Sequence, residues 1–307
     1  MKTLRNILSV MIVIGLVVLE LYLIGMISTE RFVSKQAVTK VTEQLNLVEV
    51  MSEASVTTGD GKQQTVLDEV YEVAEKANLD PSQVDAVLNS TIVKELAATY
   101  MHDVANYALK GTDHQMTGEE ISAIVRDNID VISKEAKLDA PTSQRIVTTV
   151  MQHQDEFAAL LPAPSKVFQV VDTSELEGLQ QLFDQHTKIK VVIAIIALTL
   201  LLMLVRFSFY RWLPWSSVAN VIAGAVTCLM SLGITPMIEA VLSEKNQVLL
   251  LKILDTYAHE ISQTFLVWGL VLLVISFVEI SIYSSLKYYL RQKEANDAKQ
   301  RLKEEHA

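Results

Sequence analysis

The sequence contains a single cysteine, Cys228, so no disulfide bond can form within the chain. Secreted eukaryotic domains often depend on disulfide bonds for their stability. A chain of 307 residues that lacks them therefore favours the surface of a bacterium, and we expect a Gram-positive one.

Basic residues are scarce in the middle of the chain. Between Ser28 and Thr187 there are 12 lysines and arginines against 26 aspartates and glutamates, a net charge of −14, whereas the remaining residues carry +4. Binding to nucleic acid needs a basic surface. An acidic middle with basic flanks therefore excludes nucleic acid as the expected partner.

The short motifs of common enzymes are also missing. There is no GxSxG, P-loop or dinucleotide-binding pattern, and the six histidines form no HExxH or other zinc spacing. We therefore expect a protein that is not an enzyme and that has no catalytic residue, bound metal or cofactor.

Two histidine segments offer the nearest approach to a site. Asp113-His114 together with Glu119-Glu120 has oxygen and nitrogen ligands within a short stretch, but a solvated loop followed by a helix cap explains the same residues. His259-Glu260 lies on the polar face of an amphipathic pattern, where it fits a surface better than a catalytic pair. We expect neither to carry chemistry.

Long apolar runs are what the sequence does have. A hydrocarbon core of about 30 Å needs roughly 20 apolar residues in a helix, and four stretches qualify, at residues 7–27, 188–206, 214–238 and 265–285. The first follows a basic start that is similar to a signal peptide. However, its run is longer than the usual ~7–15 residues and no Ala-x-Ala site follows, so we expect an uncleaved signal anchor.

Positive charge predicts the direction of the four spans. Lysine and arginine gather in residues 1–6, at residues 206 and 211 beside the predicted loop 207–213, and in the tail 286–307. The positive-inside rule places all three on the cytoplasmic side. We therefore predict a multi-pass protein of the cell membrane with both termini in the cytoplasm. Residues 28–187 form an extracytoplasmic domain, and residues 239–264 form an extracytoplasmic amphipathic helix.

The predicted outer domain has helical signals throughout. Asp80-Pro81 and Thr117-Gly118-Glu119-Glu120 are helix starts, and the second is a capping box followed by apolar residues at helical spacing. The predicted fold is all-α: four transmembrane helices with an all-helical domain inserted between spans one and two. We also expect the helices of spans one and two to continue without a break into this domain.

The outer domain contains a weak internal repeat. The segment from Val73, VAEKANLDPSQVDAVLNS, is similar to the segment from Ile132, ISKEAKLDAPTSQRIVTT, and their Leu-Asp pairs begin at Leu79 and Leu138. Either the two segments are copies of one helical hairpin, or two helix–loop–helix segments are alike by chance.

Polar residues recur inside the predicted spans. Span three carries small or polar residues at steps of three and four, which places them on one helix face; span four has polar residues on a shared face, and span one has a single acid. In chain order they are Glu20, then Asn220, Gly224, Thr227, Ser231 and Thr235, then Ser276 and Glu279. Such residues are costly in lipid and usually face the interior of a helical bundle.

Depth predicts which of these residues meet. At 1.5 Å per residue, Glu20 lies about 20 Å from the cytoplasmic edge and Glu279 about 10 Å, so we do not expect them to pair. The expected neighbours of Glu20 are Thr227 and Ser231, and those of Glu279 are Asn220 and Gly224, with Arg206 also within reach. The polar residues either hold the helices together or line a path for an ion, a proton or a substrate.

Three short segments carry a resemblance. Glu119-Glu120-Ile121, Asn128-Ile129-Asp130 and Leu161-Pro162 resemble a type of uncharacterised four-span membrane protein from Firmicutes. In that type a helical outer domain lies between the first two spans. The resemblance implies an architecture and no activity.

These observations favour a membrane protein that binds rather than catalyses. We expect the outer domain to bind a protein, an envelope component or a second copy of the chain, and the bundle to anchor it in the bilayer and to relay its state. The alternative is a small transporter or channel component in which Glu20 and Glu279 titrate.

Overall fold

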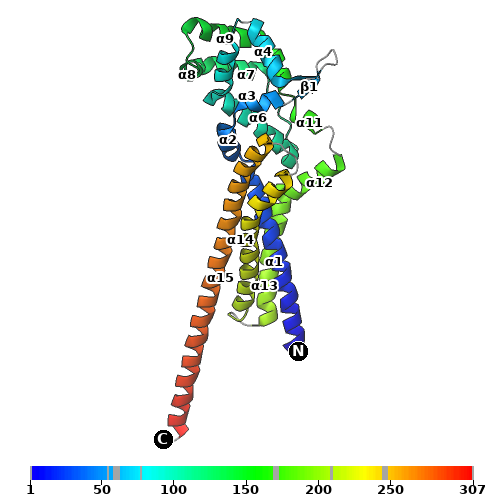
Figure 1. The fold of residues 1–307 in the computed structure, drawn as a ribbon. Coiled ribbons are helices and arrows are strands. Elements are labelled where there is room, and N and C mark those ends of the chain that lie inside the picture. Colours follow the sequence, from blue (N-terminus) through cyan, green and yellow to red (C-terminus); the bar gives the residue numbers. More distant parts are fainter. Residues whose placement is uncertain are drawn as a thin grey trace. The chain divides into compact units, whose positions relative to one another are not determined.

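The computed structural model describes residues 2–53, 55–57, 63–76, 78–168, 173–207, 210–243 and 248–305 (Figure 1). Within these ranges side chains are described except at residues 2, 55–57, 63, 76, 173, 175, 234–235, 237–243, 248–257, 300 and 302–305. The predicted stripe residue Thr235 and most side chains of the predicted amphipathic helix at 239–264 therefore lie outside the described residues.

The all-α prediction is confirmed, with one small addition. The described chain contains fifteen helices and a single β-hairpin, in which β1 (Ser55–Thr57) pairs antiparallel with β2 (Gln63–Thr65). The sequence did not predict this hairpin, because strands of three residues are too short to give a periodic pattern.

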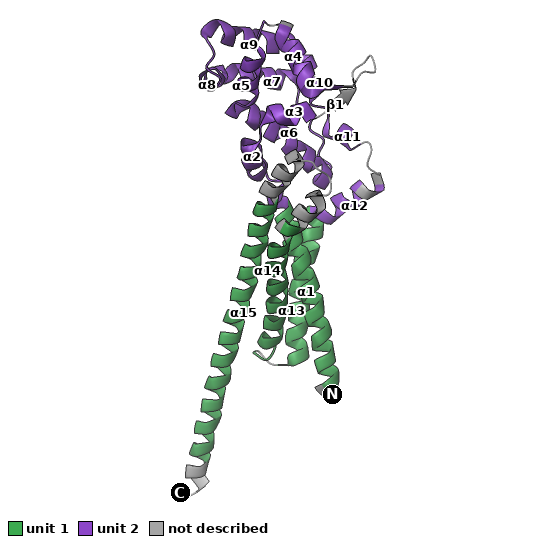
Figure 2. Cartoon of the chain, viewed as in Figure 1, with its two compact units in different colours: residues 1–29, 185–237, 258–307 green, residues 30–184, 238–257 purple. Residues whose placement is uncertain are grey.

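The chain divides into two compact units (Figure 2). Unit 1 comprises Met1–Thr29, Gln185–Met237 and Ala258–Ala307, and unit 2 comprises Glu30–Asp184 and Ile238–Tyr257. Unit 1 contains the long apolar helices and unit 2 the many short ones.

Four helices contain segments that are long and apolar enough to cross a membrane, as the sequence predicts. They are α1 (Lys2–Phe32), α13 (Gln185–Arg206), α14 (Leu213–Ser243) and α15 (Val248–Glu305). The last of these includes the fourth predicted span and continues without interruption to Glu305, far beyond what a membrane requires.

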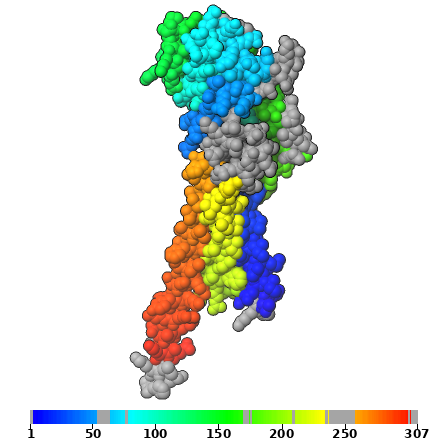
Figure 3. Space-filling view, viewed as in Figure 1, coloured from blue at the N-terminus to red at the C-terminus, as the bar shows by residue number. Residues whose placement is uncertain are grey.

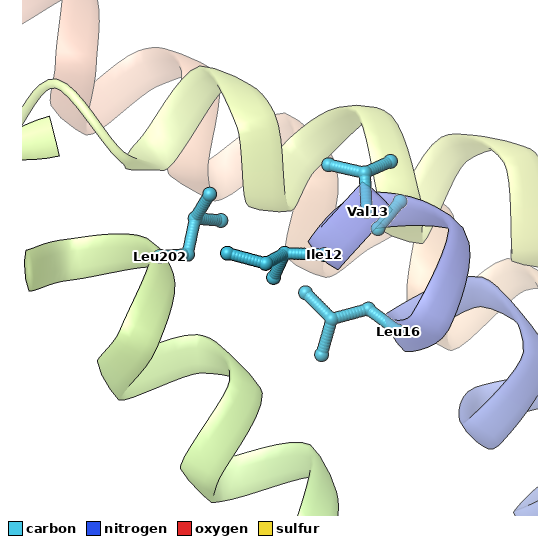
Figure 4. Close-up of a cluster of buried hydrophobic side chains, with 5 residues drawn as sticks. Ile12, Val13, Leu16 and Leu202 are labelled. Carbon is cyan, nitrogen blue, oxygen red and sulfur yellow. The ribbon is translucent and has the colours of Figure 1, made fainter. Parts of the chain in front are cut away.

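The first two spans pack together through large apolar side chains. Ile12 and Leu16 of α1 point toward Leu202 of α13, and all three side chains are buried (Figure 4). Ala219 of α14 is buried in the same cluster. This cluster joins three of the four apolar helices.

The third and fourth spans approach closely because both have glycine at the contact. A Cβ atom on Gly224 of α14 would lie 2.9 Å from the carbonyl oxygen of Gly269 on α15, and one on Gly269 would lie 2.5 Å from the sulfur of Cys228. In the space-filling view α14 (yellow-green) and α15 (orange) lie side by side (Figure 3). Small residues allow transmembrane helices this approach.

Unit 2 is built from short helices. In chain order they are α2 (Lys35–Gln44), α3 (Leu47–Glu53), α4 (Val66–Lys76), α5 (Pro81–Leu88), α6 (Thr91–Lys110), α7 (Gly118–Asp127), α8 (Ile129–Glu135), α9 (Ala140–Gln152), α10 (Gln154–Leu160), α11 (Pro164–Val167) and α12 (Thr173–Phe183).

The expected unbroken helices between the spans and the outer domain are wrong at both connections. Helix α1 ends at Phe32, and Ser34 then adopts an extended backbone and caps α2, its hydroxyl accepting the Ala37 amide at 3.4 Å. A capping side chain of this kind starts a new helix. Helices α12 and α13 are likewise separated at Asp184.

The predicted helix starts in unit 2 are confirmed. Thr117 Oγ1 accepts the Glu120 amide at 3.2 Å, and Glu120 Oε2 accepts the Thr117 amide at 2.8 Å, which is the capping box expected at the start of α7. Asp80 is the N-cap of α5, with Pro81 in the first turn.

The two similar segments have the same local structure. Each consists of a helix, a turn with a left-handed residue and a second helix begun by the aspartate of the Leu-Asp pair. Asn78 and Lys137 occupy equivalent positions in the two segments, with φ of 50° and 52°. The following leucines donate equivalent hydrogen bonds, Leu79 to the Ala74 carbonyl and Leu138 to that of Ser133. The sequence similarity therefore corresponds to a repeated helix–turn–helix unit.

Candidate functional site

Unit 2 contains a partly open apolar cavity of about 180 Å³. Its lining comes from helices α3 to α10 and contains one hydroxyl, that of Thr149. The lining residues are Met51, Val66, Val70, Val73, Ala74, Leu79, Val84, Val87, Leu88, Val93, Leu96, Ala97, Ile121, Val125, Ile132, Ile146, Thr149, Val150, Phe157, Leu160 and Leu161. A cavity of this composition excludes charged and strongly polar ligands, because they would lose hydration without a partner.

The two repeated segments build much of this cavity. One buried cluster contains Val70 and Val84 from α4 and α5, and a second contains Ile132 and Ile146 from α8 and α9. Leu79, in the turn of the first segment, packs against both clusters. The cavity therefore lies where the two segments meet.

The size of the cavity matters because protein interiors are close-packed and contain few voids larger than a water molecule. An apolar cavity of roughly 150 Å³ in another protein stays dry and binds small apolar molecules. A void costs stability of about 24 cal/mol per Å³, so an apolar occupant would stabilise this fold. The arrangement can bind an apolar group, and its lining offers no acid, base or nucleophile.

In unit 1, polar side chains of α14 and α15 meet in a second arrangement, which we call the polar seam. It consists of Ser216, Ser217, Asn220 and Ser231 on α14 and Ser262, Ser276 and Glu279 on α15. Every contact in it joins the two helices. The hydrogen bonds of the seam therefore hold spans three and four together.

Glu279 is the acidic member of the seam. Its Oε1 accepts a hydrogen bond from Ser216 Oγ at 2.8 Å, and its Oε2 accepts one from Asn220 Nδ2 at 3.0 Å. One turn away Ser217 and Ser276 hydroxyls lie 2.7 Å apart. The structure thus brings together the sequence-derived candidates Asn220, Ser276 and Glu279 along one contact.

Thr227 and Ser231 are buried on the same face of α14, but they do not bind Glu20. Thr227 donates to the carbonyl of Ala223 at 2.7 Å, and Ser231 is bonded to Ser262 of α15. Their face is turned to the fourth span.

Glu20 stands apart from these hydrogen bonds. Its Oε2 is buried and has no hydrogen-bond partner in the described part of the chain. Among the described residues no hydrogen bond joins it to Glu279, whose two carboxylate oxygens bond to Ser216 and Asn220. The structure pairs neither acid with a base among the described residues.

Arg206 does not contact Glu279 either. Its guanidinium carbon lies 4.0 Å from the ring centroid of Trp215, and Nη1 donates to Asn6 Oδ1 at 3.1 Å. The arginine therefore belongs to the contact between α1, α13 and α14.

The sequence reading missed four residues of the α14–α15 contact: Ser216, Ser217, Ser262 and Gly269. A signal was present. On span four, Ser262, Gly269 and Ser276 recur every seven residues, which is the spacing of a helix face in a coiled-coil-like contact. The same period in both spans identifies Ser217, Ser262 and Gly269, which are three of the four.

The histidine candidates have ordinary local partners. His114 Nδ1 lies 3.0 Å from Asp103 Oδ2, and its Nε2 lies 4.0 Å from Glu120 Oε1. His259 is exposed and contacts Gln263. Among the residues that the structure describes, no three histidine, cysteine or acidic side chains are placed to hold a metal ion.

Comparison of the chain with known protein families, with curated proteins and with solved structures found no match in any of the three. The resemblance to four-span proteins of Firmicutes stays a prediction, and the function rests on the geometry alone.

Proposed function

We propose that this chain is a non-enzymatic integral membrane protein of the cell surface whose helical unit 2 binds an apolar chain of an envelope component. The observation that carries the proposal is the apolar cavity of about 180 Å³ in unit 2. The four apolar helices serve as the anchor.

The occupant that fits is the end of an acyl or isoprenoid chain. The lining provides dispersion contacts and no charged group, which matches a hydrocarbon and excludes a headgroup. A protein partner inserting one large apolar side chain would use the same contacts, and the experiment below distinguishes the two.

A rigid relay of the bound state into the bundle would need unbroken helices, and the helices are interrupted at Ser34 and at Asp184. Binding and anchoring need no rigid connection.

A photoreactive fatty acid tests the proposal. We expect the full chain in nanodiscs to be crosslinked at cavity residues such as Val87, Leu96 and Ile146, located by mass spectrometry. The substitution Ala97→Met fills part of the cavity and should lower this crosslinking severalfold. Ala159→Met is the matched control, because Ala159 is exposed on α10.

Crosslinks confined to the four apolar helices would contradict the proposal, since those helices contact lipid in any case. Equal crosslinking in wild type and Ala97→Met would contradict it as well. Saturable binding of a protein that Ala97→Met abolishes, without fatty-acid crosslinks, would replace the lipid chain by a protein partner.

We infer from Glu20 a second candidate function for the chain, that of a small transporter or channel component. The observation that favours it is the Oε2 of this acid, which is buried inside an apolar helix and has no hydrogen-bond partner among the described residues. Purified protein in liposomes would then conduct protons or cations, and Glu20→Gln would abolish the flux. Absence of flux, or flux unchanged in Glu20→Gln, would exclude this function.

A further inference from the structure

One end of unit 1 gathers two arginines that have no acidic partner among the residues the structure describes. Arg5 lies in the first turns of α1, and Arg206 is the last residue of α13. Both side chains are half-buried, and Arg206 Nη1 donates to Oδ1 of Asn6, the residue next to Arg5, at 3.1 Å. Like charges that lie near each other repel, and an anion shared between them relieves the repulsion.

The chain does not supply that anion in its described residues. No carboxylate lies within 4.0 Å of either guanidinium among the described residues. Nε of Arg5 and Nε and Nη2 of Arg206 are buried without hydrogen-bond partners there. An arginine fork is suited to a phosphate, which accepts two parallel hydrogen bonds from it.

An apolar groove lies beside the arginines. It has a volume of about 360 Å³ and is lined by Val10, Val13 and Ile14 of α1 and by Pro214, Trp215, Val218 and Ile222 of α14. Trp215 belongs to both features, because its ring lies under the Arg206 guanidinium and also lines the groove. Val10 is five residues from Arg5, about 7.5 Å along the helix.

An anion site beside an apolar groove matches the two parts of a phospholipid, its phosphate and its acyl chains. Hydrocarbon fits the groove, whose exposed lining surface is apolar, and a phosphate fits the arginine pair. Tryptophan at the junction matches the level at which amphipathic rings lie in a bilayer.

We propose that unit 1 binds one anionic phospholipid, with its phosphate on Arg5 and Arg206 and an acyl chain in the groove between α1 and α14. The phosphate shares its negative charge between the two guanidiniums. The acyl chain covers the apolar side chains of the groove, so the lipid joins the first span to the third. The site is separate from the cavity of unit 2.

Lipid titration of the purified full chain in mild detergent tests the proposal. Native mass spectrometry and the thermal midpoint are measured with phosphatidylglycerol, with phosphatidylcholine and with inorganic phosphate. We expect one phosphatidylglycerol to bind and to raise the midpoint, with the other two ligands far less effective. The variant Arg5→Gln/Arg206→Gln should bind phosphatidylglycerol about tenfold more weakly or worse, since loss of about 1.4 kcal/mol is tenfold.

Two further variants separate the site from general surface charge. Arg211→Gln removes an exposed arginine near the same end and should leave binding unchanged. Ile14→Trp fills the groove and should weaken phosphatidylglycerol binding while both arginines remain. Because Ile14→Trp keeps the arginine pair, it tests the site even if the double variant folds poorly.

Three results would overturn the proposal. Equal stabilisation by inorganic phosphate would show a free-phosphate site. Equal binding of phosphatidylcholine would show that the arginines do not select lipids with an anionic headgroup. Loss of binding in Arg211→Gln as large as in the double variant would show a diffuse surface effect.

Discussion

Glu279 is an acid inside an apolar helix, and its two hydrogen bonds explain how it is accommodated. Each carboxylate oxygen has its own donor on the neighbouring helix, Ser216 for one and Asn220 for the other. Glu20 has no such partner for its Oε2 among the described residues. The two acids therefore have different surroundings, with Glu279 hydrogen-bonded to the neighbouring helix and Glu20 Oε2 not bonded to the described residues.

The first prediction concerns the hydrogen bonds of Glu279. Glu279→Leu leaves two donors buried without an acceptor and should lower the free energy of unfolding by about 1–3 kcal/mol. Glu279→Gln keeps one acceptor oxygen and should cost less. Unfolding of the purified protein in mild detergent measures both.

Ser281→Ala is the control for Glu279, because Ser281 is exposed on the same helix and bonds only to the carbonyl of Phe277. A loss in Glu279→Leu no larger than in Ser281→Ala would show that the polar seam does not stabilise the bundle.

Helix α14 offers a comparison between two glycines, which gives the second prediction. A Cβ atom on Gly224 would meet the backbone oxygen of Gly269 at 2.9 Å, whereas one on Gly233 would meet nothing within 4 Å. Gly224→Ala must therefore push α14 and α15 apart and should cost about 1–3 kcal/mol. Gly233→Ala should be neutral or slightly stabilising, because alanine is the better helix former.

Thermal midpoints of the two glycine variants in the same detergent make this comparison. A similar midpoint for Gly224→Ala and Gly233→Ala would contradict the close approach of the third and fourth spans.

The start of α7 gives a prediction about pH. The backbone amide and hydroxyl of Thr117 bond to Glu120 and lower the pKa of its carboxyl group. A lowered pKa in the folded state contributes stability above the unfolded value of about 4.3, and this contribution is lost as pH falls through the folded value. Glu120→Gln should therefore lower the unfolding temperature at pH 7, and its difference from wild type should shrink below about pH 4.

Circular dichroism at pH 7 and pH 3 follows this difference. Glu95→Gln is the control, since Glu95 is exposed on α6 and its carboxylate has no partner in the described chain. A gap between Glu120→Gln and wild type that stayed constant with pH would show that the charge of Glu120 does not stabilise the cap.

Local features of the elements were predictable from sequence, and long-range ones were not. The cap at Thr117 and the start of α5 at Asp80 need only neighbours in the chain, so their residue types identify them. The break at Ser34 was missed because apolar spacing continued across it, although serine is a common helix cap. The partners of the polar seam lie 31 to 63 residues apart in the chain, so the spacing of residues within one helix cannot show that they meet.

At the scale of the whole molecule, composition was the reliable guide. Four apolar runs predicted four helices able to cross a membrane, and the structure contains them. The cavity of unit 2 could not be predicted, because its lining comes from eight short helices whose packing depends on the whole unit. The sequence does not distinguish an apolar side chain that fills a core from one that lines a cavity.

The distribution of positive charge gives the last prediction, which concerns orientation. We expect unit 2 outside the cell and residues 286–307, which follow the fourth span, inside it. The reason is that lysine and arginine gather at the ends of the spans on one side of the membrane. Cys228 is the sole cysteine, so Cys228→Ala provides a background without thiols. In that background, Gln152→Cys on α9 should react with a membrane-impermeant maleimide in intact cells, because Gln152 is exposed in unit 2. Gln292→Cys on α15 is equally exposed and should react only after the cells are permeabilised, and the opposite pattern would reverse the orientation and place the Arg5–Arg206 site in the outer leaflet.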